Sequence, residues 1–181
     1  MEGYIPPRET IIYPRLDPND LGKEVVKVAI VGLAVIPGDP PDSVYHFRFS
    51  LIFADGYYVR LDNNPFKLTD PVVRTRGQLE IDSSDEVTET DTIAWRSEVS
   101  RAVTAGDILR FVLVEKKREQ YDFDDNGEGC RTWCEAVLKD LIEMGVMSDT
   151  ALDSFNAWEK DMKIKRGYRI PVPRPTGTSY N

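Results

Sequence analysis

Hydrophobic and polar residues alternate most regularly over residues 44–62, a pattern typical of a β-hairpin. The first strand alternates one face of Tyr45, Phe47, Phe49, Leu51 and Phe53 with another of Val44, His46, Arg48, Ser50 and Ile52. Asp55-Gly56 is a strong turn signal, and the returning strand carries Tyr58, Arg60 and Asp62 on one face. The turn could therefore bring His46 beside Arg60 and Asp62 on a shared polar face.

A second pattern has the spacing of a helix and begins at a cysteine. Apolar or small residues recur at Cys130, Trp133, Cys134, Val137, Leu138, Leu141 and Met144. Gly145 is a plausible stop signal. The spacing predicts a helix with one buried face and with Cys130 in its first turn, where unpaired N–H groups and the helix dipole favour a thiolate.

Weaker patterns predict further strands and one further helix between residues 25 and 121. Residues 25–36 are a β-branched run and predict a buried strand, and residues 77–82 predict a short one. Residues 95–103 fit either a strand or a short helix. Residues 104–121 could be a strand at their apolar centre, but Thr104 and its acidic third position resemble a capping box, so we predict a helix.

These elements predict an α+β fold with an antiparallel β-sheet of four or five strands packed against the cysteine-bearing helix. A further helix is predicted to begin at Ser148 or Asp149. The expected organisation is an irregular N-terminal segment over residues 1–24, a single α+β domain over 25–166 and an extended proline-rich tail over 167–181.

Composition narrows the classes of partner. The chain of 181 residues carries a formal net charge of −8, which argues against nucleic acid or an anionic membrane as the main partner. We expect no membrane span, because no apolar run approaches the roughly 20 residues that a span requires. Residues 1–10 lack a secretory pattern, and two cysteines four residues apart are poorly placed for a disulfide, so we expect a cytoplasmic protein. The sequence carries no signal for an oligomeric state.

We expect no metal or other cofactor. Asp122, Asp124, Asn126 and Gly127 match the opening of an EF-hand calcium loop, but its twelfth position, which must supply a bidentate carboxylate, is Trp133. One histidine and two cysteines on adjacent turns give no plausible set of four zinc ligands.

Two segments resemble a known family. H-F-R-F-S-L-I-F-A-D-G-Y-Y-V-R-L is similar to the first-histidine hairpin of the lecithin–retinol acyltransferase-like proteins, a circularly permuted branch of the NlpC-type papain-like superfamily. T-A-G-D-I-L-R-F-V-L-V-E-K-K-R-E-Q-Y-D-F-D-D-N-G-E-G-C-R-T-W-C resembles the later segment that opens that family's nucleophile helix. The whole chain also resembles a fungal domain family with a Gly-Glu-Gly-Cys-Arg signature, which teaches no chemistry.

The resemblance to the permuted papain-like proteins implies roles for particular residues. It implies that Cys130 is a nucleophile and His46 its general base. The residue that orients the base in that family falls on Arg60, which is a donor only and cannot accept the imidazole N–H, whereas Asp62 on the same face can. Gly129 is another departure, because the family has Asn before its cysteine.

The leading hypothesis is therefore a thiol-dependent hydrolase or acyl/amide transferase that acts on a small molecule through Cys130, His46 and Asp62. The neighbouring Arg48 is expected to lower the pKa of His46 and leave it neutral, as suits a base. Three alternatives stay open. Cys130 could be a small buried hydrophobe; the protein could be a non-covalent cyclase or isomerase of a small-molecule biosynthetic pathway; or it could be a non-catalytic binding module. The predicted substrate-binding residues, which could equally form an ordinary polar sheet face, are Arg48, Ser50, Tyr58 and Arg60.

Overall fold

The computed structural model describes residues 11–34, 44–65, 76–85, 92–124 and 128–179. Asn126 and Gly127 of the EF-hand-like loop lie outside the described residues, as do the first ten residues of the N-terminal segment and the last two of the tail. Within the described part, no helix is both long enough and apolar enough to cross a membrane.

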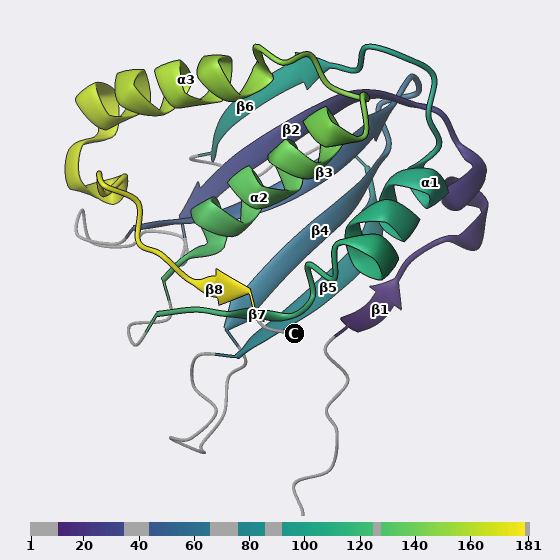
Figure 1. The fold of residues 1–181 in the computed structure, drawn as a ribbon, viewed down its shortest axis with the longest axis horizontal. Coiled ribbons are helices and arrows are strands. Elements are labelled where there is room, and N and C mark those ends of the chain that lie inside the picture. The colour runs from purple at the N-terminus through teal and green to yellow at the C-terminus, as the bar shows by residue number, and fades with distance from the viewer. Residues whose placement is uncertain (1–10, 35–43, 66–75, 86–91, 125–127, 180–181) are drawn as a thin grey trace, which may run out of the picture.

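The centre of the fold is a six-stranded sheet with the strand order β1-β5-β4-β3-β2-β6 (Figure 1). The strands are β1 (Ile11–Arg15), β2 (Val25–Ala34), β3 (Tyr45–Phe53), β4 (Tyr58–Pro65), β5 (Gly77–Ser84) and β6 (Thr92–Glu98). All neighbours pair antiparallel except β1 and β5, which are parallel. The prediction of a wholly antiparallel sheet of four or five strands is thus corrected to a mixed sheet of six.

The added strand, β1, lies in the segment that was expected to be irregular. Its pairing with β5 joins positions more than sixty residues apart and shifts register between Ile12 and Arg15. Such a strand is defined by a distant partner rather than by local alternation, which explains why its sequence does not predict it. Of residues 95–103, which fitted a strand or a short helix, the first four belong to β6 at the opposite edge.

Helices cover one face of the sheet, where α2 and α3 cross it side by side (Figure 1). The helical elements are η1 (Pro18–Gly22), α1 (Ala105–Arg110), the π-helix η3 (Phe111–Glu115), α2 (Cys130–Glu143), α3 (Ala151–Arg166) and η4 (Gly167–Arg169). The predicted capping box is confirmed, since Thr104 and Asp107 bond reciprocally at the start of α1. A separate two-stranded sheet joins β7 (Tyr121–Asp122) to β8 (Thr178–Ser179).

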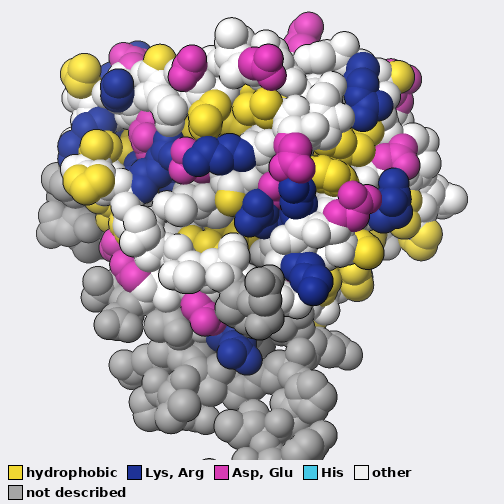
Figure 2. Space-filling view, viewed as in Figure 1, with side chains coloured by type: hydrophobic (Ala, Val, Ile, Leu, Met, Phe, Trp, Pro, Cys, Tyr) yellow, Lys and Arg dark blue, Asp and Glu magenta, His cyan; other side chains and the backbone are white. Residues whose placement is uncertain are grey.

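The alternation predicted for residues 44–53 is confirmed in β3. Its aromatic and aliphatic face is buried and belongs to one core with Trp133, Val137 and Leu141 of α2. The opposite face of the sheet holds a smaller apolar cluster around Val31 and Leu33 of β2. Over the helix-bearing side, positive and negative side chains are interspersed rather than gathered into a field of one sign (Figure 2).

The hairpin of β3 and β4 is paired at one end and divided at the other. Its ladder joins residues 49–52 to residues 58–61, next to the turn. Residues 45–48 and 62–65 form no rungs with each other in the described chain, although β3 still pairs there with β2 and β4 with β5. We call the paired part the closed end of the hairpin and the divided part its open end. The open end is where the sheet has room for groups from outside it.

Candidate functional site

The start of α2 meets the sheet at the open end. The backbone N–H of Phe47 donates to Sγ of Cys130, with the nitrogen 3.3 Å from the sulfur. Phe53, six residues along the same strand, donates its N–H to the carbonyl of Tyr57 across the hairpin. Alternate N–H groups of a strand point the same way, so the N–H of Phe47 also points toward β4. At the open end the sulfur of Cys130 therefore takes the place of a ladder carbonyl.

The only histidine bridges this sulfur and a buried carboxylate. His46 Nε2 lies 2.5 Å from Oδ1 of Asp62, and the imidazole also interacts electrostatically with the Cys130 side chain. Arg48 Nε lies 2.5 Å from the other carboxylate oxygen of Asp62. The arrangement is a row of sulfur, imidazole and carboxylate with an arginine behind it.

The charges in this row stabilise one another. Burial by itself would lower the pKa of His46, but hydrogen bonds and charge from Asp62 and Cys130 outweigh burial and raise that pKa to about 10. Burial would likewise raise the pKa of Asp62, yet the hydrogen bond from His46 and the charges of His46 and Arg48 hold it below its ordinary value. The prediction of a neutral His46 is wrong. Arg48 is ion-paired with Asp62, and the pKa of His46 is raised rather than lowered.

The second cysteine is in a different environment. Cys134 is fully buried in the core, and burial raises its pKa well above the ordinary value. It therefore stays a neutral thiol. Cys130, by contrast, is partly exposed and lines a cavity. The two sulfurs, one helical turn apart, differ enough to be told apart chemically.

A cavity of about 690 Å³ lies at the open end. It is bounded by both halves of the divided hairpin, the first turn of α2 and the C-terminal segment. The lining residues are Leu33, Val44, Tyr45, His46, Phe47, Arg48, Asn64, Pro65, Gln78, Glu80, Glu128, Gly129, Cys130, Arg131, Pro171 and Pro175. This volume and a largely apolar wall with a few polar groups are typical of small-molecule sites.

The first turn of α2 leaves its backbone N–H groups without a side-chain cap in the described chain. The preceding Gly129 has a φ of 137°, a conformation that favours glycine. A Cβ at this position would also lie 2.9 Å from Oη of Tyr121 and 3.1 Å from the nitrogen of Gly177. Uncapped N–H groups at a helix start favour negative charge, here beside the sulfur.

The predicted site residues divide between the two ends of the hairpin. Arg48 lines the cavity, whereas Ser50, Tyr58 and Arg60 lie at the closed end and are not among its lining residues. Arg60 is turned to Asp82, with 2.6 Å between its Nη2 and the carboxylate oxygen. The structure thus brings together Cys130, His46, Asp62 and Arg48 from the predicted set.

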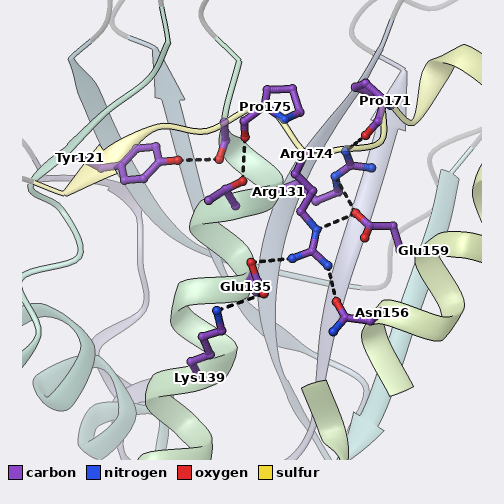
Figure 3. A network of polar contacts seen from close by, with 11 residues as sticks. Tyr121, Arg131, Glu135, Lys139, Asn156, Glu159, Pro171, Arg174 and Pro175 are labelled. Atoms are coloured by element: carbon purple, nitrogen blue, oxygen red, sulfur yellow. Dashed lines mark hydrogen bonds and ion pairs between the residues drawn. The ribbon is translucent and has the colours of Figure 1, made fainter. Parts of the chain in front are cut away.

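Other groups at the site have no equivalent in the sequence prediction. Figure 3 shows a polar network that ties the C-terminal segment to the start of α2 and to α3. Arg131 donates to the carbonyl of Pro171 and lies 3.0 Å from Glu159, and Arg174 lies 2.7 Å from the same carboxylate. Arg131 directly follows Cys130 but is not one of the apolar positions of the helix pattern, so that pattern gives no signal for it. Nothing in the sequence pairs it with residues some forty positions later.

Part of the EF-hand-like loop lies within the described residues. Oδ1 of Asp124 accepts a hydrogen bond from the backbone N–H of Glu128, at 2.8 Å. Among the residues that the structure describes, no group of three His, Cys, Asp or Glu side chains is arranged to hold a metal ion.

Comparison with known proteins places the chain in a family. The model of the family described as "Domain of unknown function (DUF7770)" matches residues 28–180, so the chain belongs to that family. No curated protein and no solved structure matches the chain.

Proposed function

We propose that this member of the DUF7770 family is a thiol-dependent hydrolase or acyl/amide transferase with a permuted papain-like arrangement, and that its substrate is a small molecule. The observation that carries the proposal is the position of His46, which lies 2.5 Å from Asp62 and interacts electrostatically with the Cys130 side chain. Nucleophile, base and a third group that orients the base are the three parts of activated-nucleophile catalysis.

In the proposed reaction, His46 holds the proton of the Cys130 thiol while the sulfur attacks the carbonyl carbon of the substrate. The carbonyl oxygen becomes an oxyanion, which the N–H groups at the start of α2 stabilise. As the oxyanion collapses, the bond to the leaving group breaks and His46 returns the proton to that group. Water or an acceptor alcohol or amine, deprotonated by His46, then attacks the thioester and releases the acyl product. Asp62 keeps the imidazole oriented and stabilises its charged form throughout.

The charges around the cavity favour a neutral or positively charged substrate over an anionic one. Arg48 is paired with Asp62 and Arg131 with Glu159, so both guanidinium groups already have an anionic partner. Two further carboxylates, Glu80 and Glu128, line the cavity. The apolar part of the wall suits a hydrocarbon or aromatic body.

Acylation by p-nitrophenyl acetate tests the proposal. Wild-type protein should release a burst of p-nitrophenolate, one per protein molecule, as the acetyl group moves to Cys130, and Cys130→Ser should abolish the burst. Cys134→Ala is the matched control that removes the other thiol and should keep the burst. Iodoacetamide should label Cys130 faster than Cys134, because only Cys130 is accessible beside a base. Peptide mass spectrometry of the labelled protein identifies the modified residue.

The same experiment separates covalent catalysis from the alternatives. A protein that works as a non-covalent cyclase or isomerase, or as a binding module, would show no burst. Iodoacetamide would still label Cys130 first in such a protein, because Cys130 is the more exposed thiol. A missing burst would therefore sink the thiol mechanism.

A further inference from the structure

The C-terminal segment of residues 170–179, here called the strap, crosses the first turn of α2 (Figure 3). Oγ1 of Thr132 donates to the carbonyl of Pro175, at 2.7 Å, and Arg131 donates to the carbonyl of Pro171. Both prolines also line the cavity. The strap therefore forms a wall of the cavity and is held by the two residues that follow Cys130.

Arg174 anchors the middle of the strap to two helices (Figure 3). Its guanidinium lies 2.5 Å from Glu135 of α2 and 2.7 Å from Glu159 of α3, and it donates to the side-chain oxygen of Asn156 at 2.6 Å. The two carboxylates and the guanidinium are largely shielded from solvent. Such a multiply bonded arginine fixes the strap in one position.

One tyrosine connects the strap to the residue before the nucleophile. Oη of Tyr121 donates to the carbonyl of Gly129, at 2.9 Å, and accepts the backbone N–H of Gly177 in the strap, at 3.1 Å. Tyr121 is buried, and burial raises its pKa above the ordinary value, so the hydroxyl keeps its proton for Gly129. Pairing of β7 with β8 holds the tyrosine backbone against the strap.

The Gly129 carbonyl fixes the direction of the Cys130 N–H. The two groups belong to one peptide unit, which is planar and trans, so they point in opposite directions. The carbonyl accepts from Trp133 N–H at 2.9 Å as well as from Tyr121, which occupies both of its lone pairs. Because glycine at a φ of 137° offers the backbone little intrinsic restraint, these two bonds set the orientation of the peptide.

We propose that Tyr121 is a positioning residue: together with the strap it holds the Gly129–Cys130 peptide so that the Cys130 N–H is aimed at the oxyanion formed on the sulfur-bound carbon. This inference rests on the proposed thiol mechanism. It extends that mechanism to a residue outside the row of sulfur, imidazole and carboxylate. Tyr121 is not among the residues that line the cavity, so it acts through the backbone.

Two reactions of the same thiol isolate this effect. Acylation by p-nitrophenyl acetate passes through a tetrahedral oxyanion, whereas alkylation by iodoacetamide displaces iodide and forms none. Tyr121→Phe removes only the hydroxyl, so the acylation rate should fall about tenfold while the alkylation rate changes by less than about twofold. Tyr13→Phe, at an exposed tyrosine of β1, is the matched control and should change neither rate.

A second variant tests the same inference if Tyr121→Phe fails to fold. Thr132→Val keeps the shape of the side chain and removes the bond to Pro175, which loosens the strap without touching the tyrosine. It should lower acylation by a smaller factor and leave alkylation unchanged. Circular dichroism and thermal melts establish that each variant is folded.

The outcomes separate this inference from the mechanism it rests on. Equal losses of acylation and alkylation in Tyr121→Phe would mean that the tyrosine supports the thiol or the fold. An unchanged acylation rate would mean that its hydroxyl does not contribute to stabilising the oxyanion. Both overturn the inference while the burst in wild-type protein keeps the thiol mechanism standing. A missing burst in wild-type protein overturns both.

Discussion

Each end of the β3–β4 hairpin has a buried carboxylate paired with an arginine, but the two carboxylates have different further partners. At the closed end, the guanidinium groups of Arg15 and Arg60 lie 3.0 and 2.6 Å from the buried carboxylate of Asp82. At the open end, a buried carboxylate again accepts from a cationic neighbour, but the row continues through His46 to a sulfur that reaches a cavity. Asp82 is paired with two arginines, whereas Asp62 also contacts His46, which can exchange a proton.

The difference follows from what enters the sheet. A paired ladder leaves no room between strands, so polar side chains on its face can bond only with one another. Where the strands part, the first turn of α2 supplies a sulfur to the N–H of Phe47. The same alternation of residues thus gives a static ion pair at one end and a candidate reactive site at the other.

The largest effect should come from the imidazole at the open end. His46→Gln keeps an N–H donor for Asp62 but cannot carry a proton, so acylation of Cys130 by p-nitrophenyl acetate should fall by roughly 100- to 10,000-fold. Stopped-flow measurement of p-nitrophenolate release gives the rate. A loss of less than about threefold would contradict a role for His46 as the base.

A change at the closed end should give the opposite result. Asp82→Asn leaves Arg60 without its ionised partner and should lower the free energy of unfolding by about 3 kcal/mol. The rate at which iodoacetamide labels Cys130 in the folded protein should stay the same. Urea unfolding and labelling kinetics measure the two quantities. Slower labelling with unchanged stability would show that the closed end also belongs to the site.

A third effect should appear in the pH dependence of stability. His46 has a pKa of about 10 in the folded state, against an ordinary value of 6.5. Between these values the folded state holds a proton that the unfolded state has released. The stabilisation is complete below pH 6.5 and is lost as pH rises toward 10, with a slope of up to about 1.4 kcal/mol per pH unit. Asp62→Asn removes a group that holds the imidazolium and should flatten this slope.

Urea unfolding at several pH values across that window measures the slope in both proteins. Equal slopes would show that Asp62 does not raise the pKa of His46. Groups elsewhere titrate alike in the two proteins, so their contribution cancels in the comparison.

Local patterns predict much of the hairpin and of α2. Strict alternation over residues 44–53 specifies which face of β3 is buried, and helical spacing after Cys130 specifies which side of α2 meets the sheet. Placing His46 and Asp62 on one face of a hairpin also follows from alternation and a turn signal. These features depend on neighbours within about twenty residues.

What alternation cannot specify is where a pair of strands divides. Ser50, Tyr58 and Arg60 share a face with His46, but they lie where the ladder is closed and the cavity is absent. The division depends on the position of α2, which is set by packing between segments some eighty residues apart. The strap and the strand β1 belong to the same class of feature, because each is defined by a distant partner.

The hydrogen bond from Phe47 to the sulfur has a practical consequence. The shielding of an amide proton depends on the atom that accepts it, so the Phe47 resonance in a nitrogen–proton NMR spectrum is a built-in reporter of that sulfur. Ionisation, acylation or oxidation of Cys130 would move this one peak within a β-strand, and its displacement could be followed in real time without a chromogenic compound.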